Sequence, residues 1–349
     1  MRLLILYTEL AGYVLGNYKQ FLDSNPNAEL LVIHYPVNPE APFNFESFQR
    51  TKFIVFDINK ANSIGQTILN FRPDAVLCSG WSNRIYLDWV KDLDKHVKKV
   101  ICFDNQWNGN LKQRFLSLVS SFTFLKMFQF AWVPGEPQKK YATKIGFHPN
   151  DVFTGLYPAD SKLFIPIGKH KLSQRGIYPK VILSVARYIP QKDLPTMWNA
   201  FIEANQETGE NWSMQCIGFG EQFDQRLQDA SISHLGFKQP NEIETYALNA
   251  GVYVLPSTYE PWGVAVHEMA LSALPMVLSD KVGAATMFLN KGNGYSFPAG
   301  DKEKLKDVFK TIMTLSDQQL WEMAEASYRS GLQLSSDDWA NTLHTIIKK

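Results

Sequence analysis

Short apolar runs alternate with longer amphipathic stretches along the whole chain, and this alternation limits the possible folds more than any other feature of the sequence. A short run that is apolar at successive positions is typical of a strand buried on both faces, as in parallel sheets. Parallel strands need long crossover connections, and the amphipathic stretches between the runs can supply these as helices. The sequence therefore predicts an α/β protein with doubly wound, Rossmann-like parallel sheets.

The apolar runs form two series. Strands of the first series are predicted at Leu3–Tyr7, Leu30–His34, Phe53–Phe56, Ala75–Leu77, Val100–Phe103 and Phe130–Val133. Strands of the second series are predicted at Val181–Ala186, Ser213–Ile217, His234–Leu235, Val252–Leu255 and Met276–Leu278. The predicted helices include Lys60–Asn70, Pro137–Ile145 and the closing stretch Trp339–Ile347. Two series of strands predict two sheets.

A chain of 349 residues also suits two domains better than one. Between the two series, Tyr157–Ile177 contains two prolines and two glycines with weak periodicity, so we place an interdomain linker there. The predicted domains are residues 1–165 and 166–335, with the helix 336–349 packing back on the first. Two such domains would face a central cleft and bind ligands at the carboxyl ends of their strands.

Charge and cysteine content exclude several classes of protein. Lys and Arg number 35 against 34 Asp and Glu, so no global field attracts a polyanion and no nucleic-acid partner is expected. Cys78, Cys102 and Cys216 lie far apart in the sequence, which favours a reducing compartment over a disulfide scaffold or a zinc site. The first apolar run is too short for a signal peptide, and none approaches the ~18 residues of a membrane span. We expect a cytoplasmic protein, at most peripheral at the inner membrane face.

The segment from Ser257 to Glu268 carries the clearest indication of a binding site. It follows the predicted strand Val252–Leu255 and leads into an apolar helix, with Glu260 in the intervening loop. Gly263 allows a ligand to approach the backbone, and the free N–H groups at the helix start suit a phosphate. The helix would begin with Val264 and Ala265.

Within this segment two carboxylates would flank a phosphate-sized gap. Glu268 lies about five residues into the helix, which is roughly 7 Å along its axis at 1.5 Å per residue. One carboxylate could hold sugar hydroxyls and the other ribose hydroxyls. Taken alone, two glutamates at this spacing would more simply be solvated side chains.

Other loops of compatible chemistry also follow predicted strands. Arg187 and Lys192 leave the end of Val181–Ala186, where a departing diphosphate would need positive charge. Gly218 and Gly220 follow Ser213–Ile217, and Gly236 with Phe237 follows His234–Leu235. Each feature is common by itself, but the four loops together predict a site for a nucleotide-diphosphate ligand.

These motifs resemble the retaining glycosyltransferases of family 4, which have the GT-B fold of two Rossmann-like domains. The resemblance covers about residues 180–300, and it is carried by Arg187 to Lys192, Gly218 to Glu221, the Glu260-x7-Glu268 element and Pro275 to Asp280 with Gly283. Trp262 stands where the family usually has Phe. The N-terminal half is similar mainly in layout, and Phe103 replaces the histidine of a His-Asp pair, which leaves Asp104.

The resemblance implies a role for each matched residue. Arg187 and Lys192 would bind the donor diphosphate, Glu260 the transferred sugar and Glu268 the ribose. The backbone near Gly236 and Phe237 would border the base. The predicted catalytic residues are Glu260, Arg187 and Lys192, and the predicted donor-binding residues are Gly12, Gly218, Gly220, Gly236, Phe237, Trp262, Gly263, Val264, Ala265 and Glu268.

The acceptor would meet the loops that follow the N-terminal strands. Trp81 and Trp107 offer flat surfaces on which a sugar ring could stack, although both could instead pack beneath the loops. Asp104 and Asn105 could hold hydroxyls, and Tyr13 follows the first loop. Tyr13, Trp81, Asp104, Asn105 and Trp107 are therefore the predicted acceptor-binding residues.

The predicted function is the transfer of a hexose-type sugar, with retention, from a UDP- or GDP-linked donor to a glycan, lipid-linked or small-molecule acceptor, in surface polysaccharide or glycoconjugate synthesis. Cationic side chains and a helix N-terminus at the diphosphate would replace a divalent metal, so no metal or other cofactor is expected. The alternatives are a nucleotide-sugar 2-epimerase of the same fold and a catalytically idle nucleotide-sugar binding module.

Two features have more than one interpretation. His267 lies inside the glutamate motif, and we interpret it as a packed or surface side chain. The stretch Leu111–Phe130 is rich in Phe and Leu, with Lys112, Arg114 and Lys126 among them. We favour a core helix of the first sheet for this stretch, and the alternative is an amphipathic face that contacts a membrane.

Overall fold

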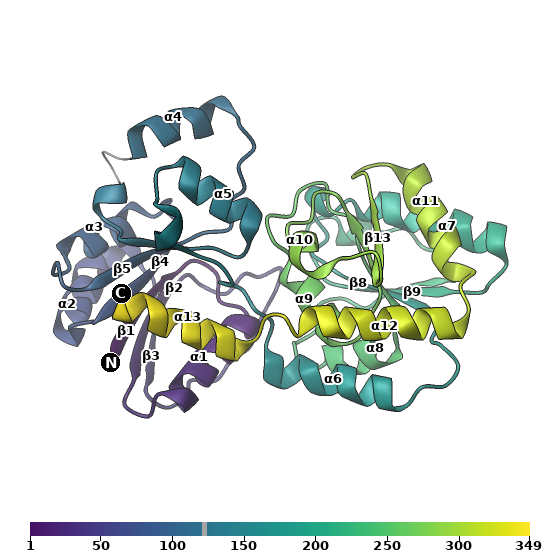
Figure 1. Ribbon diagram of the computed structural model, residues 1–349, viewed down its shortest axis with the longest axis horizontal. Helices are drawn as coiled ribbons and strands as arrows, with labels where there is room; N and C mark the ends of the chain where they lie inside the picture. Colours follow the sequence, from purple (N-terminus) through teal and green to yellow (C-terminus); the bar gives the residue numbers. More distant parts are fainter. Residues whose placement is uncertain (121–123) are drawn as a thin grey trace. The chain divides into compact units, whose positions relative to one another are not determined.

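The computed structural model describes residues 1–120 and 124–349 and divides into two compact α/β units (Figure 1). Unit 1 comprises Met1–Asn38, Asn44–Pro158 and Ser335–Lys349, and unit 2 comprises Pro39–Phe43 and Ala159–Leu334. The chain thus passes from unit 1 to unit 2 at Pro158, where the sequence led us to place the boundary at 165. The closing helix belongs to unit 1.

Unit 1 is built on a seven-stranded parallel sheet with the strand order β3-β2-β1-β4-β5-β6-β7. Its strands are β1 (Arg2–Tyr7), β2 (Glu29–His34), β3 (Thr51–Val55), β4 (Ala75–Ser79), β5 (Lys98–Cys102), β6 (Phe130–Trp132) and β7 (Val152–Phe153). Its helices are α1 (Gly12–Ser24), α2 (Ala61–Phe71), α3 (Arg84–Asp92), α4 (Leu111–Val119), α5 (Glu136–Lys144) and α13 (Ser336–Lys348).

Unit 2 is built on a six-stranded parallel sheet with the order β10-β9-β8-β11-β12-β13. Its strands are β8 (Val181–Val185), β9 (Ser213–Ile217), β10 (Ile232–His234), β11 (Val252–Leu255), β12 (Met276–Ser279) and β13 (Gly294–Phe297). Its helices are α6 (Ser161–Ser173), α7 (Leu194–Thr208), α8 (Ile243–Asn249), α9 (Val264–Leu271), α10 (Ala285–Phe288), α11 (Lys302–Met313) and α12 (Asp317–Gly331).

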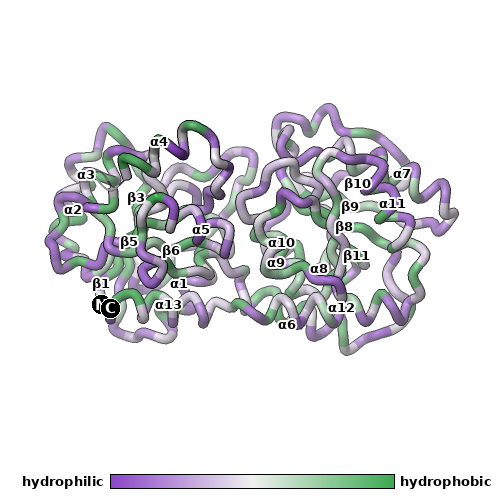
Figure 2. Tube along the Cα trace, turned by 45° about the horizontal axis from the view of Figure 1, so that its top comes forward, coloured by the Kyte–Doolittle hydropathy of each residue, from purple (hydrophilic) through white to green (hydrophobic). Residues whose placement is uncertain are grey.

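Both sheets reverse their strand order at one point, and this confirms the predicted pair of Rossmann-like, doubly wound sheets. In unit 1 the reversal lies between β1 and β4, and in unit 2 it lies between β8 and β11. The loops that follow the two central strands of such a sheet diverge and leave a crevice where ligands bind. In Figure 2 the strands run through the hydrophobic part of each unit, while the outer loops are mainly hydrophilic.

Two parts of the sequence interpretation are wrong. The stretch interpreted as a linker contains α6, whose N-cap Asp160 accepts a hydrogen bond from the backbone N–H of Lys162. Pro166 lies inside this helix, where it removes one backbone donor, and its presence made the segment look irregular. The short strands β7 and β13 were not predicted, because β7 has only two residues and the sequence of β13, Gly294–Phe297, is not a continuous apolar run.

The stretch Leu111–Phe130 is not one core helix. It contains α4, which ends at Val119, the short 3-10 helix η3 (Phe124–Lys126) and the start of β6. Residues 121–123, which fall inside this interpretation, lie outside the described residues. Phe128 and Phe130 are buried, but Leu111, Phe115 and Leu118 on α4 are exposed. The preferred interpretation therefore fails for α4.

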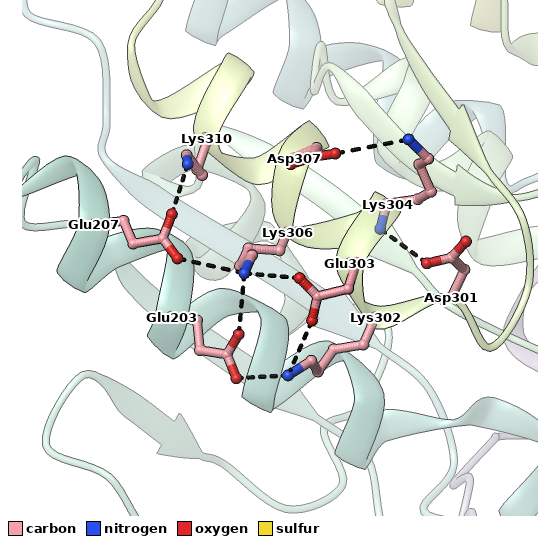
Figure 3. A network of polar contacts seen from close by, with 9 residues as sticks. All are labelled: Glu203, Glu207, Asp301, Lys302, Glu303, Lys304, Lys306, Asp307 and Lys310. Atoms are coloured by element: carbon pink, nitrogen blue, oxygen red, sulfur yellow. Dashed lines mark hydrogen bonds and ion pairs between the residues drawn. The ribbon is translucent and has the colours of Figure 1, made fainter.

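Ion pairs fasten two helices that cover one face of the second sheet. Lys302, Lys306 and Lys310 of α11 contact Glu203 and Glu207 of α7 at nitrogen-to-oxygen distances of 2.6–3.4 Å (Figure 3). In unit 1, α13 packs against α1 through Trp339, whose ring contacts those of Tyr18, Phe21 and Trp132. No helix among the described residues is long and apolar enough to cross a membrane.

Candidate functional site

The reversal point of the second sheet brings two predicted catalytic residues together. Lys192 ends the short 3-10 helix η5 (Pro190–Lys192) after β8, and Glu260 lies in the loop after β11. The ammonium Nζ of Lys192 donates a hydrogen bond to Oε2 of Glu260, and the two side chains are only 16% and 12% exposed. The backbone N–H of Thr258 donates to the carbonyl of Gln191 at 2.8 Å and so joins the two loops. A paired cation and anion thus lie in the crevice of this sheet.

The loop that carries Glu260 is fixed by its backbone. The N–H of Glu260 donates to the carbonyl of Lys281 at 3.2 Å, and its carbonyl accepts from the N–H of Gly283 at 3.0 Å. The hydroxyl of Ser257 donates to Oε2 of Glu260 at 3.4 Å. The loop and its carboxylate are therefore held in place by hydrogen bonds within unit 2.

The start of α9 lies directly beside this carboxylate. Gly263 is the N-cap residue with φ +91°, and a Cβ atom there would lie 3.0 Å from Cγ of Glu260. Only glycine adopts this conformation readily and leaves room for the glutamate. Val264 and Ala265 form the first turn of α9, where backbone N–H groups have no partner within the helix. The site therefore combines a cation, a carboxylate and a positive helix end.

Glu268 lies one turn further along α9 and is half-buried. Burial raises the pKa of its carboxyl to about 7, and the negative charge of Asp160 adds to this effect. Tyr253 of β11 is buried near both glutamates. Its pKa is raised by this burial and then by the negative charges of Glu260 and Glu268. Sequence reasoning missed Tyr253 and Asp160, since only the folded structure shows that they lie near the two glutamates.

Arg187 has a different partner from Lys192. Its side chain is 42% exposed, and Nη1 lies 3.6 Å from Oε2 of Glu40. Glu40 belongs to Pro39–Phe43, the short segment of the N-terminal half that is part of unit 2. The side-chain amide of Gln239 donates to the carbonyl of Pro42 at 2.9 Å and ties the same segment to the unit. An exposed pair of this kind is weak, so a diphosphate could displace Glu40 from Arg187.

The glycines of the neighbouring loops have different physical roles. Gly218 has φ +142°, and a Cβ atom there would lie 1.9 Å from the carbonyl oxygen of Ala186. Gly220 has φ +155°, and its Cβ would lie 2.7 Å from the carbonyl oxygen of Tyr188. Both therefore let the loop after β9 pack against the loop after β8. Gly236 has φ +68° with open space around it and lies in the loop after β10, followed by the half-buried Phe237.

Two side chains of the motif point into the protein. The Trp262 side chain is 2% exposed and meets Phe288 edge to face, so any contact with a donor must come from its backbone. His267 is fully buried and stacks on Phe288. Its Nδ1 accepts from the N–H of Ala159 at 2.9 Å, and its Nε2 lies 2.9 Å from the carbonyl of Gly331. Burial lowers the pKa of this imidazole to about 4, which keeps it neutral and makes Nε2 the donor.

The reversal point of the first sheet contains hydroxyl groups instead of an ion pair. The hydroxyl of Tyr7 is hydrogen-bonded with those of Tyr13 and Tyr157. The hydroxyls of Thr8 and Ser79 lie 3.3 Å apart. Burial raises the pKa values of Tyr7 and Tyr157 well above 10. These tyrosines line a cavity of about 20 Å³, which has room for roughly one water molecule.

The other predicted acceptor-binding residues lie in two groups. Asp104 lies with the tyrosines, since its negative charge raises the pKa of Tyr157. Gly12 is the first residue of α1, directly before Tyr13. Trp81 and Trp107 instead pack around Tyr141, and the ammonium of Lys144 lies 5.0 Å from the centre of the Trp107 ring. Both indoles keep part of their surface exposed, and Asn105 is exposed. Tyr7 and Tyr157 were not predicted, because burial at a strand end is not visible in the sequence.

The side chains in the described ranges contain no group of three His, Cys, Asp or Glu residues arranged to hold a metal ion. The polar groups that could contact an anionic ligand are instead Lys192, Arg187 and the first turn of α9. Their positive character suits a phosphate, and the neighbouring carboxylates suit hydroxyl groups.

Sequence comparison matches one family over part of the chain. Residues 172–329 match the family described as "Glycosyl transferases group 1". A probable sucrose-phosphate synthase of Solanum tuberosum is 24% identical over 193 residues, which cover 48% of this chain and 18% of that protein. The amylovoran biosynthesis glycosyltransferase AmsK of Erwinia amylovora is 29% identical over 143 residues, which cover 37% of this chain and 35% of AmsK. The matched segments thus span less than half of each relative.

Structural comparison extends the similarity to the whole chain. The Anabaena protein Alr3699/HepE, solved in complex with UDP-glucose, superimposes with a TM-score of 0.72 and 14% identity, over 100% of this chain and 99% of HepE. At this level of identity the comparison shows the fold alone. The fold is the two-sheet α/β architecture of the GT-B type, as predicted.

Proposed function

We propose that this chain of GT-B fold, whose residues 172–329 match the group 1 glycosyl transferases, is a glycosyltransferase that uses a nucleotide-diphosphate sugar. The observation that carries the proposal is the partly buried pair of Lys192 and Glu260 at the reversal point of the second sheet, beside the first turn of α9. A diphosphate needs the cation and the helix start, and a sugar needs a fixed carboxylate.

Binding of the donor would replace two ion pairs of the free protein. Lys192 and Arg187 would move from Glu260 and Glu40 to the diphosphate, and Glu260 would then accept hydrogen bonds from hydroxyls of the transferred sugar. Glu268 would accept from the ribose hydroxyls, and the backbone at Gly236 and Phe237 would border the base. Because the cations and the helix end supply positive charge where it develops, the reaction would need no divalent metal.

The proposed chemistry is transfer with retention. The bond between the anomeric carbon and the diphosphate oxygen breaks, and its electron pair leaves with the diphosphate. The acceptor hydroxyl forms the new bond on the same face, and its proton passes to the leaving phosphate oxygen. This route is favoured because Glu260 is assigned to the hydroxyls of the transferred sugar and Glu268 to the ribose, which leaves neither glutamate as the nucleophile of a double displacement.

Relatives suggest the donor base and the biological setting. HepE was solved with UDP-glucose, so we propose a UDP-linked hexose as the first donor to test. AmsK is named for amylovoran biosynthesis, which supports a role in surface polysaccharide or glycoconjugate synthesis. The acceptor would be a glycan, a lipid-linked sugar or a small molecule bound by the loops of unit 1.

The test is a screen of UDP- and GDP-linked sugars by thermal shift, each with and without a chelator. We expect a UDP-linked hexose to raise the melting temperature equally in both conditions. Loss of the shift with chelator would exclude metal independence, and the absence of a shift with every nucleotide sugar would exclude the donor site itself.

The competing activities need a second measurement. Incubation with donor alone would change the sugar only if the protein is a 2-epimerase. With an acceptor present, the anomeric configuration of the product by NMR distinguishes retention from inversion. A protein that binds the donor but transfers it to no acceptor and hydrolyses none would be the idle binding module.

The acceptor side is tested by Asp104→Ala and Trp107→Ala. Both should impair transfer while leaving nucleotide affinity nearly unchanged, since the two residues lie in unit 1. Transfer at the parent rate by both folded variants would show that the acceptor is recognised elsewhere.

A further inference from the structure

Helix α4 exposes apolar side chains to solvent, whereas an ordinary surface helix turns its apolar face toward the core. Leu111, Phe115 and Leu118 are 84%, 67% and 74% exposed, and they are three of the ten large apolar side chains that are exposed in the described part of the chain. Their spacing of four and three residues places them on one face of the helix. Nine residues of helix thus present a continuous apolar stripe to solvent.

Two polar side chains of the same segment lie on the other side of the helix and are held by backbone groups. Gln113 accepts from the backbone N–H groups of Asn108 and Gly109 at 2.7 and 3.0 Å and donates to the carbonyl of Gln106 at 2.6 Å. Just beyond α4, the fully buried Ser120 donates to the carbonyl of Ile145. At 100° per residue, positions 113 and 120 lie on the side of the helix opposite to 111, 115 and 118. The polar contacts therefore fix the helix with its apolar stripe outward.

The sequence of the segment that carries the stripe is basic. The sequence has no Asp or Glu between Asp104 and Glu136, while Lys112, Arg114 and Lys126 lie in that interval. Arg114 is exposed, and its Nε donates to the carbonyl of Gly109 at 2.9 Å. The bond from Ser120 to Ile145 also brings the end of α5, with the exposed Lys144, next to the end of α4. Figure 1 shows α4 at the outer margin of its unit.

We propose that α4 is a membrane-contact helix that inserts Leu111, Phe115 and Leu118 into the surface of a bilayer containing anionic lipids. An apolar stripe with basic side chains near it binds the boundary between acyl chains and anionic headgroups. A second copy of the chain fits less well, because three side chains offer a few hundred Å² and a stable interface needs about 800 Å² on each partner. The contact would place the enzyme at the surface where lipid-linked acceptors are found, and it does not depend on the proposed catalysis.

The test is flotation of the full chain with vesicles of phosphatidylcholine alone or with about 30% phosphatidylglycerol. The parent should float with the anionic vesicles, less so when salt is raised from about 0.1 to 0.5 M. Phe115→Ser/Leu118→Ser should reduce binding at least about tenfold, and Arg114→Gln should reduce it only on anionic vesicles. The matched control is Ile177→Ser/Leu332→Ser in unit 2, whose apolar side chains are also exposed, and it should bind like the parent.

Several outcomes would overturn the proposal. One is a parent chain that binds neither kind of vesicle, and another is a control variant that loses as much vesicle binding as Phe115→Ser/Leu118→Ser. A third is a parent that is dimeric by light scattering and becomes monomeric when Phe115 and Leu118 are replaced. Because the vesicles contain no sugar acceptor and no nucleotide is added, failure here would leave the donor-site proposal untouched. Circular dichroism and the melting temperature without ligand show that each variant is folded.

Discussion

The two sheets have the same strand order at their centres but opposite chemistry at their reversal points. Between β8 and β11 lie an ion pair, a second carboxyl with a raised pKa and a helix start. Between β1 and β4 lie the hydroxyls of Tyr7, Tyr13 and Tyr157 beside a cavity for roughly one water. The same backbone architecture therefore positions an ion pair and a helix start in one unit, and hydroxyl groups beside a single carboxylate, Asp104, in the other.

This difference indicates how the proposed reaction would be divided between the units. A diphosphate carries and gains negative charge, so its site must supply cations and oriented dipoles. A sugar hydroxyl is neutral, so hydrogen-bonding groups suffice to position it. If the assignment is right, charge substitutions in unit 2 should affect turnover, and hydroxyl substitutions in unit 1 should leave the nucleotide site intact.

The largest effect is expected from Lys192→Ala. Removing a preorganised cation from a developing anion should lower kcat by about 10²- to 10³-fold, which corresponds to about 2.7–4 kcal/mol of transition-state stabilisation. Arg187→Ala should also lower kcat, whereas Glu268→Ala should mainly weaken nucleotide binding, because ribose contacts persist from the ground state to the transition state. Steady-state kinetics with the donor identified by thermal shift provide the measurement.

A matched control for this prediction is Lys281→Ala. Lys281 is near the same loop but pairs on the surface with Asp280 at 3.0 Å, so its loss should change kcat by less than about twofold. If Lys192→Ala raised KM alone, the lysine would serve ground-state binding and the proposed role in the departure of the diphosphate would be wrong.

The second prediction compares a glycine in the loop after β9 of unit 2 with one in the loop after β4 of unit 1. Gly218→Ala would force Cβ against the carbonyl oxygen of Ala186 at 1.9 Å, so the free energy of unfolding should fall by about 3 kcal/mol or more. Gly80→Ala, in the loop after β4, has a similar left-handed requirement with φ +66° but open space, and it should cost about 1–2 kcal/mol. Urea denaturation of both variants measures the difference, and equal losses would show that the loop after β9 can relax.

The sequence predicted the central strands well, and the physical reason is clear. Runs such as Val252–Leu255 are buried on both faces, so every position is apolar and the run is easy to recognise in the sequence. The positions of Glu260 and Lys192 after two such strands were also predicted, and the structure has them there, while their chemical roles stay predictions. Their direct pairing was not predicted, because it depends on β8 lying next to β11, and strand order is a property of the whole sheet.

The features that were missed depend on tertiary burial. Helix α6 was taken for a linker because Pro166 and weak amphipathicity hide its pattern. Phe115 and Leu118 were assigned to a core on composition alone, and only the contacts of Gln113 show that α4 faces the other way. An apolar side chain in a sequence indicates burial only when another part of the protein is known to pack against it.

The third prediction uses the raised pKa of Glu268. This carboxyl has an ordinary pKa of 4.5 when unfolded and about 7 in the folded protein. The folded protein therefore loses stability as the pH rises from 4.5 to about 7, and the loss is constant above pH 7 and absent below pH 4.5. Glu268→Gln removes that cost. The melting temperature of the variant should therefore exceed that of the parent by a margin that grows between these pH values and is constant above them.

Differential scanning calorimetry between about pH 4.5 and 8 measures this margin. The same variant should bind nucleotide more weakly, since an amide accepts fewer hydrogen bonds from ribose than a carboxylate. A margin that does not change with pH would mean that Glu268 ionises normally in the folded state.

The smallest effect is expected from Tyr157→Phe in unit 1. The change removes one hydroxyl from the group around Tyr7, so the free energy of unfolding should fall by about 1 kcal/mol, the net contribution of one hydrogen bond. Tyr328→Phe in unit 2 is the control, because the buried Tyr328 hydroxyl has no hydrogen-bond partner among the described residues and its removal should be neutral or stabilising. Nucleotide affinity should stay within about twofold of the parent in both variants, measured by isothermal titration calorimetry. A large loss of nucleotide affinity in Tyr157→Phe alone would mean that the hydroxyls of the first sheet contribute to the donor site, and the division of roles between the two reversal points would then fail.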